Sequence, residues 1–136
     1  MLKDIDFKKV TDLALAVVPD EEGSPSDPEQ YKVYLINLGI EPITSVMVTS
    51  QGYGTVDGKE VKTSTIRQLI ELIGGQQFVA VEIITEELKQ LSNQFWVSFY
   101  QKGQLYDKKY VFVTESINEE FFTHIPLLGK KGVMIR

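Results

Sequence analysis

Residues 93–113, NQFWVSFYQKGQLYDKKYVFV, constrain the fold more than any other part of the chain. Phe95, Val97 and Phe99 occupy every second position of the first half, which is the two-residue period of a β-strand. The second half is again rich in aromatic and β-branched residues, which favour a pleated, half-buried surface. The stretch therefore predicts a β-hairpin against which the rest of the chain packs.

Lys102 and Gly103 set the expected register of this hairpin. A two-residue turn is favoured there, because glycine tolerates positive φ. It places three residues of one strand opposite three of the other, in the pairs Phe99–Tyr106, Val97–Lys108 and Phe95–Tyr110. Lys108 fits among these apolar side chains only near an open end of the sheet, with its amine extended to water. The alternative is a three-residue turn with a bulge at Gly103, which would slip the register and reverse the faces of one strand.

With the two-residue turn, the two faces of the hairpin differ in character. The core face holds Phe95, Val97, Phe99, Tyr106, Tyr110 and Phe112. The opposite face holds Trp96, Tyr100, Leu105 and Lys109, and the lysine can cover the indole ring by a cation–π contact. Because Trp and Tyr are enriched at interface hot spots, we interpret these four residues as a partner surface for another protein or a second copy. The alternative is that the apolar tail at residues 125–136 covers this face within the same chain.

Further short strands surround the hairpin in the predicted fold. They span residues 13–18, 31–38, 43–53, 59–66 and 78–84, with a tight turn at Asp57-Gly58. The apolar residues at 66, 69, 70 and 73 have helical spacing, but neighbouring strands can extend such a segment. Helix and strand therefore both stay open for residues 66–73. Thr85 is a candidate cap for one helical turn over residues 85–91.

These elements predict a single all-β domain over residues 1–136. The expected architecture is an antiparallel β-sandwich of roughly seven strands with at most one or two short helices. The chain has no pair of cysteines around its tryptophan, so the fold is immunoglobulin-like in architecture only. Residues 20–30, DEEGSPSDPEQ, are expected to form a mobile acidic loop.

The composition is that of a globular protein, with 43% hydrophobic and 24% charged residues among 136. No apolar stretch is long enough to predict a transmembrane helix, and the charged first residues do not resemble a signal peptide. The absence of cysteine excludes a disulfide framework and thiolate metal sites. These features lead us to expect a cytoplasmic protein.

The net charge of −5 disfavours nucleic acid as a partner. It arises mainly in residues 1–30, which hold eight acidic and three basic side chains. The basic residues near the carboxyl end form at most a small local patch, comprising Lys102, Lys108, Lys109, Lys130, Lys131 and Arg136.

Two loops resemble ligand-binding motifs but fail on spacing. In residues 52–60, GYGTVDGKE, Tyr53 and Glu60 stand where a phosphate-binding P-loop needs a glycine and a hydroxyl residue. A calcium loop counted from Asp20 has Pro25 where glycine is required and Tyr31 where a bidentate glutamate is required. A hairpin and a solvated loop are the simpler interpretations.

The titratable side chains do not define an active site either. His124 is the only histidine, and no nucleophile motif accompanies it. Glu82, Glu86 and Glu87 lie close in sequence, but acid–base catalysis needs facing carboxylates, which spacing alone does not establish. We therefore predict no catalytic, cofactor-binding or metal-binding residue.

Five runs of sequence carry a resemblance to a known family: YKVYLINLG, VTSQGYG, KTSTIRQL, LSNQFWVSFY and YDKKYVFV. They resemble a family of small bacterial proteins of uncharacterised function, known chiefly from the Bacteroidota. Some members carry the label phenylalanyl-tRNA synthetase subunit alpha. The resemblance covers most of the chain from Tyr31 onward and implies a stand-alone cytosolic protein. It does not imply synthetase activity, because a class II synthetase core is far longer and Arg67 and Arg136 are the only arginines.

The leading functional hypothesis is a non-enzymatic β-sandwich domain that acts through protein–protein contacts. One alternative is an enzyme or small-ligand binder whose site is assembled from loops. A second alternative is an RNA-associated accessory protein that uses the lysines near the carboxyl end.

Overall fold

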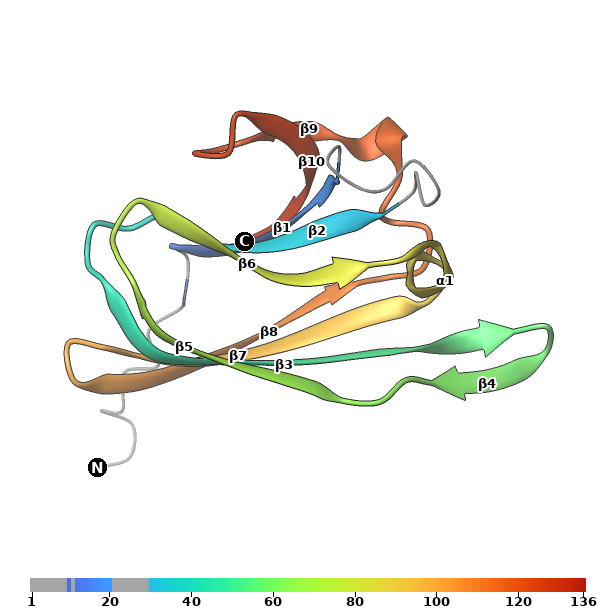
Figure 1. Ribbon diagram of the computed structural model, residues 1–136, viewed down its shortest axis with the longest axis horizontal. Helices are drawn as coiled ribbons and strands as arrows, with labels where there is room; N and C mark the ends of the chain where they lie inside the picture. Colours follow the sequence, from blue (N-terminus) through green and yellow to red (C-terminus); the bar gives the residue numbers. More distant parts are fainter. Residues whose placement is uncertain (1–9, 11, 21–29) are drawn as a thin grey trace, which may run out of the picture.

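Strands with alternating apolar residues pack as two antiparallel sheets in the computed structural model (Figure 1). The structure describes residues 10, 12–20 and 30–136. Sheet A has the strand order β6-β2-β1-β10-β9, and sheet B has the order β4-β3-β7-β8 with β5 paired to β3. The all-β sandwich is thereby confirmed, with ten strands in the described residues where the sequence predicted fewer.

The strands of sheet A are β1 (Leu13–Pro19), β2 (Tyr31–Asn37), β6 (Gln77–Ile84), β9 (Thr123–Ile125) and β10 (Lys130–Ile135). Those of sheet B are β3 (Ile43–Val56), β4 (Lys59–Lys62), β5 (Ile66–Ile73), β7 (Ser92–Gln101) and β8 (Gln104–Phe112). The described chain also has a short helix, α1 (Glu86–Lys89), and a 3₁₀ helix, η2 (Glu119–Phe121). Thr85 caps α1 as predicted, by accepting a hydrogen bond from the Leu88 backbone N–H.

The β7–β8 hairpin has the predicted two-residue register. The structure pairs Phe99 with Tyr106, Val97 with Lys108 and Phe95 with Tyr110. Lys102 and Gly103 both have positive φ, 52° and 75°, which matches the twist of a tight hairpin turn. This pairing excludes the bulged alternative.

The residues that the sequence predicts for the core face of the hairpin do face the core. Their side chains are buried except for Tyr106, which is half-buried. The Phe99 and Tyr106 rings stack with their centroids 5.4 Å apart, and the Phe95 and Phe112 rings meet edge to face at 6.2 Å. Aromatic pairs of this kind stabilise a sheet by roughly 0.2–1 kcal/mol each relative to alanine pairs.

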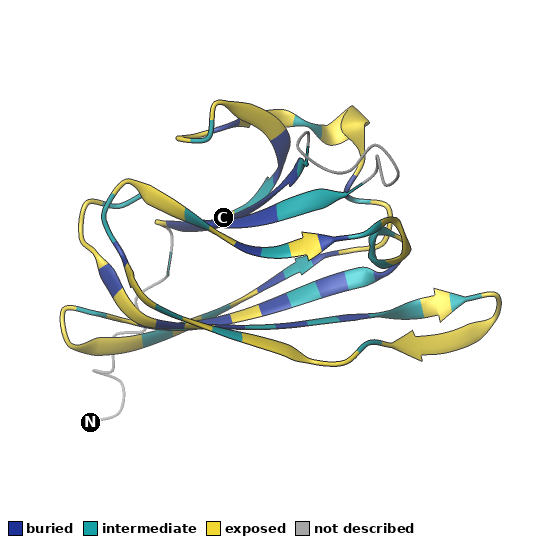
Figure 2. Cartoon of the chain, in the orientation of Figure 1, coloured by how far each residue is buried: buried dark blue, intermediate teal, exposed yellow. Residues whose placement is uncertain are grey.

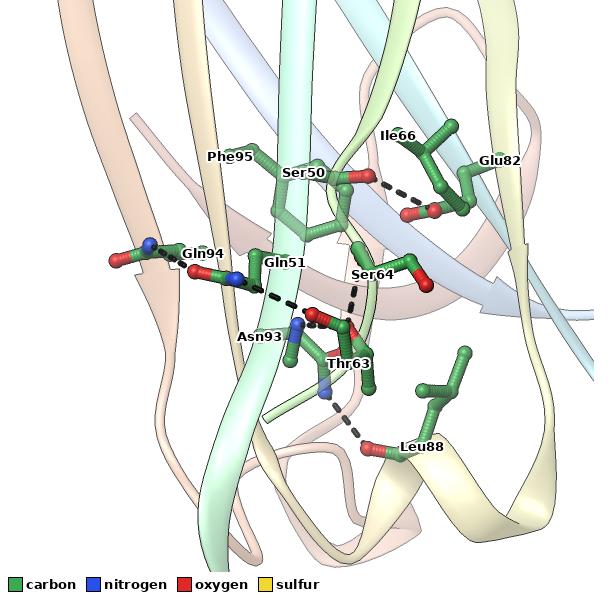
Figure 3. A pocket seen from close by; sticks show the side chains of 11 residues that line it. Ser50, Gln51, Thr63, Ser64, Ile66, Glu82, Leu88, Asn93, Gln94 and Phe95 are labelled. Carbon is green, nitrogen blue, oxygen red and sulfur yellow. Dashed lines mark hydrogen bonds between the residues drawn. The ribbon is translucent and has the colours of Figure 1, made fainter. Parts of the chain in front are cut away.

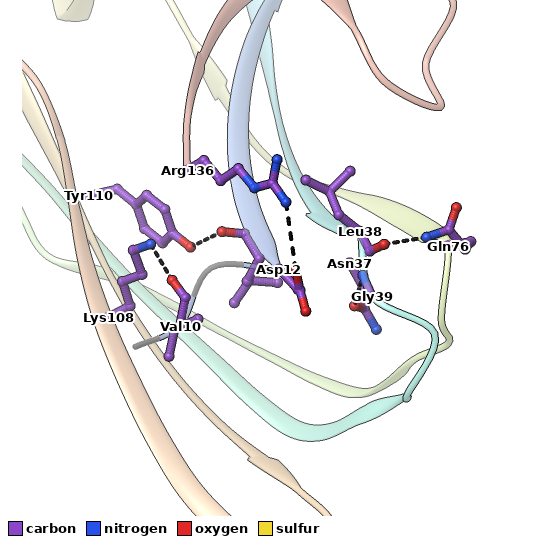
Figure 4. A network of polar contacts seen from close by, with 10 residues as sticks. Val10, Asp12, Asn37, Leu38, Gly39, Gln76, Lys108, Tyr110 and Arg136 are labelled. Carbon is purple, nitrogen blue, oxygen red and sulfur yellow. Dashed lines mark hydrogen bonds and ion pairs between the residues drawn. The ribbon is translucent and has the colours of Figure 1, made fainter. Parts of the chain in front are cut away.

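The amine of Lys108 has a protein acceptor that the sequence did not predict. Its Nζ donates a hydrogen bond to the Val10 carbonyl oxygen at 2.6 Å and lies 5.2 Å from the centroid of the Tyr110 ring (Figure 4). Burial, together with the positive charge of Arg136, lowers the pKa of the Lys108 amine.

Residues 66–73 form strand β5 and not a helix. The strand pairs with β3 from Ile43↔Ile73 to Ser50↔Ile66, so the backbone groups on that side gain ladder partners. In this strand Ile73 is buried, whereas Leu69 and Leu72 are exposed. Tertiary pairing has overridden the local helical spacing, as it often does in short segments.

Strand β1 is buried on both faces, which explains its unbroken apolar sequence. Leu15 and Val17 lie in the core between the sheets, whereas Ala14 and Ala16 lie in a second apolar cluster. Ile125 of β9 belongs to this second cluster. The small alanine side chains therefore leave room for the tail on the outer side of sheet A.

The carboxyl-terminal tail docks on the domain as predicted, but on sheet A. Strand β10 pairs with β1, and β9 pairs with β10 (Figure 1). A Cβ atom at Gly132 would lie 2.3 Å from the Val17 carbonyl oxygen, so this close approach requires glycine. The alternative that the tail covers the Trp96 side of the hairpin is wrong.

Two predictions concern the remaining parts of the chain. The acidic loop predicted at residues 20–30 lies largely outside the described residues, and its ends meet where the Asp20 N–H donates to the Gln30 carbonyl oxygen at 2.9 Å. No described helix has the length and apolar character needed to cross a bilayer.

Asn37 holds together the corner where β5 leaves sheet B and the chain enters β6. Its Nδ2 lies 2.8 Å from the Glu41 carbonyl oxygen and 3.1 Å from that of Gly74, and its Oδ1 accepts from the Gly39 N–H at 3.1 Å. The side chain is buried, so each of these backbone groups depends on it in place of water.

We expect Asn37→Ala to lower the free energy of unfolding by about 2 kcal/mol, because several part-buried backbone groups lose their partner together. Chemical denaturation measures this loss. Asn118→Ala is the matched control, since Asn118 caps only the exposed η2 and should cost about 0.5–1 kcal/mol. Equal losses in the two variants would contradict a central role for Asn37.

The Tyr110 hydroxyl donates a buried hydrogen bond to the Leu13 carbonyl oxygen at 2.6 Å, and burial raises the pKa of this phenol (Figure 4). Tyr110→Phe should lower the free energy of unfolding by about 1–2 kcal/mol, since the carbonyl loses its donor. Tyr106→Phe removes the same atom on the same strand, where the hydroxyl has no partner among the described residues. Denaturation curves should show little loss for that control. A similar loss in both variants would argue against the hydrogen bond as the cause.

Candidate functional site

The strands of sheet B carry many exposed residues, coloured yellow in Figure 2, and several of them are large and apolar. Three rows of cross-strand neighbours over β5, β3, β7 and β8 make up the surface that we name the outer face. The rows are Leu72–Thr44–Tyr100–Leu105, Leu69–Met47–Ser98–Asp107 and Arg67–Thr49–Trp96–Lys109.

All four residues predicted for a partner surface lie on the outer face. Trp96 pairs with Lys109 and Tyr100 pairs with Leu105. The Lys109 Nζ lies 5.6 Å from the centroid of the Trp96 ring, in the expected cation–π position. Trp96 is 50% exposed and Leu105 is 55% exposed, so neither belongs to the core.

Sequence reasoning missed the part of the outer face that β3 and β5 contribute. Met47, Leu69 and Leu72 add three large apolar side chains, with exposed fractions of 43%, 69% and 59%. Arg67 adds a second cation in the row of Trp96. Arg67 and Leu69 are two positions apart, as residues on one face of a strand are. This spacing identifies them as outer-face residues only once residues 66–73 are known to form a strand.

A second feature is a pocket of about 180 Å³ between the two sheets (Figure 3). Ser50 of β3 and Glu82 of β6 face one another there, and the Ser50 hydroxyl donates to Glu82 Oε1 at 2.9 Å. Ser50 is buried and Glu82 is half-buried. A polar contact thus joins the two sheets at the edge of the sandwich.

The pocket forms where the strand along the edge of β3 is interrupted. Strand β4 ends at Lys62 and β5 begins at Ile66, so the residues between them leave the ladder. Thr63 fills the gap, because its N–H donates to the Gly52 carbonyl oxygen at 2.9 Å and its hydroxyl accepts from the Gly52 N–H at 2.8 Å. Gly52 is enclosed by Leu91, Asn93 and Thr63, which a Cβ atom would meet at 3.3 Å.

Burial raises the pKa of the Glu82 carboxyl, and the hydrogen bond from Ser50 opposes this shift only in part. A raised pKa in the folded state means that folding favours the protonated carboxyl. The stabilisation from this group is therefore complete below the ordinary glutamate pKa of 4.5 and is lost as the pH rises through the raised pKa.

Glu82→Gln should accordingly raise the melting temperature near pH 7 and leave it nearly unchanged at a pH of about 4. The amide oxygen of glutamine can still accept from Ser50. Glu87→Gln is the matched control, since it removes one negative charge from an exposed position on α1. Melting curves of both variants across this pH range test the expectation. It fails if the two variants show the same change at each pH.

The other candidate residues are not brought together. His124 is exposed on β9 of sheet A, whereas Glu86 and Glu87 are exposed in the first turn of α1. The segment at residues 52–60 belongs to the β3–β4 hairpin, with its turn at Asp57 and Gly58. In the part of the chain that the structure describes, no three His, Cys, Asp or Glu side chains gather in a group that could hold a metal ion.

No family model matches the chain, and no curated protein matches it. The resemblance to the small bacterial family therefore stays a prediction.

Proposed function

We propose that the protein is a non-enzymatic domain that binds another protein through the outer face. The observation that carries this proposal is the exposed row of Trp96 and Lys109, bordered by the apolar side chains of Tyr100, Leu105 and Met47. Tryptophan and tyrosine contribute large contact areas with few rotatable bonds, and they dominate binding energy at many interfaces.

The charges of the outer face indicate the chemistry of the partner. Arg67 and Lys109 contribute +2 and Asp107 contributes −1, which gives the face a net charge of +1 in a chain of net charge −5. The two cations flank Trp96 in one row. A partner with an apolar surface edged by carboxylates complements this pattern, and the complementarity would steer its approach.

The size of the outer face favours a transient complex. Three rows across four strands cover about 20 Å by 20 Å, or roughly 400 Å², from the spacings of strands and residues. A stable interface buries about 800 Å² on each partner. A contact of this size belongs to the class of small, transient interfaces.

We expect Trp96→Ser combined with Tyr100→Ser to abolish capture of the partner from a lysate of the native cell, with little change in melting temperature. Phe121→Ser combined with Leu127→Ser is the matched control, because it removes exposed apolar area from the other side of the sandwich. Arg67→Glu combined with Lys109→Glu should also weaken capture, by reversing the charges that flank Trp96. Mass spectrometry of the captured protein identifies it for a direct binding measurement.

Trp96 is the only tryptophan, so its fluorescence reports directly on coverage of the outer face. Addition of the purified partner should shift its emission to shorter wavelength and protect it from a soluble quencher.

Unchanged capture by the Trp96/Tyr100 variant, with a large fall in melting temperature, would show that these residues serve the fold alone. A doubled mass in light scattering that this variant abolishes would instead place a second copy on the face.

A further inference from the structure

The pocket beside Ser50 and Glu82 contains a carboxylate, and its described lining includes no positively charged side chain. Glu82 is the one ionisable side chain among the described residues that line it. No described lysine or arginine forms an ion pair with this carboxylate. The carboxylate is half-buried, and its one donor among the described residues is the neutral Ser50 hydroxyl. A cation that reaches this carboxylate would stabilise its charge.

The other polar groups of the wall include acceptors with lone pairs to spare for a ligand. The Thr63 carbonyl oxygen accepts from Gln51 Nε2 at 3.1 Å, and the Ser64 carbonyl oxygen accepts from the Thr63 hydroxyl at 3.0 Å. Each carbonyl has a second lone pair. Asn93 has its Nδ2 engaged with the carbonyl oxygens of Leu88 and Leu91, at 2.8 and 3.1 Å. The pocket therefore suits a ligand that donates hydrogen bonds.

We propose that this pocket binds a small primary alkylammonium ion, with its ammonium group on the Glu82 carboxylate and its alkyl stem against Leu88 and Phe95. Both apolar side chains line the pocket, on the side of α1 and β7 respectively (Figure 3). The ammonium group supplies three donors on one small cation, which matches an acceptor-rich wall around a single carboxylate.

Size and geometry narrow the class of ligand. The pocket has a volume of about 180 Å³, so it suits a small ligand. An ammonium ion is a compact donor group, and both Glu82 oxygens keep lone pairs that can accept from it beside the bond from Ser50. The raised pKa of Glu82 supports the same conclusion, since it reports a carboxylate that lacks solvation.

The test is a titration of the ¹⁵N-labelled protein with n-butylammonium chloride near pH 7, followed by amide chemical shifts at constant ionic strength. Saturable shifts are expected at Ser50, Thr63 and Glu82. Glu82→Gln should weaken binding at least tenfold, whereas Glu87→Gln, which removes the same charge from exposed α1, should leave it unchanged. 1-Butanol, the neutral analogue, should give no saturable shift.

A second measurement does not depend on any variant. The pKa of the Glu82 carboxyl, followed by its ¹³C shift, should fall when n-butylammonium saturates the wild-type protein, because the bound cation favours the ionised form. Equal affinity in Glu82→Gln, equal binding of 1-butanol, or an unchanged Glu82 pKa in the presence of the amine would each overturn the proposal.

Discussion

The register of β7 against β8 determines the character of both faces of sheet B. Strand β7 lies between β3 and β8 and pairs with both. The side of the sheet to which a β7 residue points is therefore also the side to which its partners on β3 and β8 point. A slip of one residue would bring Trp96 to the core and expose Phe95 and Phe99. Full burial of one such aromatic side chain is favourable by roughly 1.5–3 kcal/mol, so the slipped pairing loses several kcal/mol. The positive φ values at Lys102 and Gly103 close the turn in the favoured register.

Elements whose cause is local could be predicted from the sequence. The β7–β8 hairpin, the turn at Asp57-Gly58 and the cap at Thr85 each follow from a few neighbouring residues, and the structure confirms them. Residues 66–73 were ambiguous because their helical spacing can be seen within the segment itself. The strand that pairs with them and keeps them extended, β3, lies outside the segment. The environment of Lys108 was missed for the same reason, since Val10 lies far away in sequence.

The two candidate sites also differ in whether neighbouring or distant residues of the sequence form them. Trp96 and Lys109 face one another across a hairpin, so their contact is contained in one stretch of sequence. Ser50 and Glu82 lie 32 residues apart on different sheets, and their hydrogen bond depends on how the sheets stack. The pocket beside them arises from a break in an edge strand. Neither feature has a sequence motif, because the chemistry comes from packing and not from spacing.

The tail that docks on sheet A makes the sandwich asymmetric. In the described residues, β9 and β10 close over the alanine side of β1, while the outer face of sheet B stays open. Sheets with two open faces can stack repeatedly and propagate into extended assemblies. Here the two outer surfaces differ, because residues 125–136 complete the second apolar cluster on sheet A while the outer face of sheet B has no such cover among the described residues. A partner that docked on the outer face would leave a different surface on the far side of the molecule, which disfavours repeated stacking through identical faces.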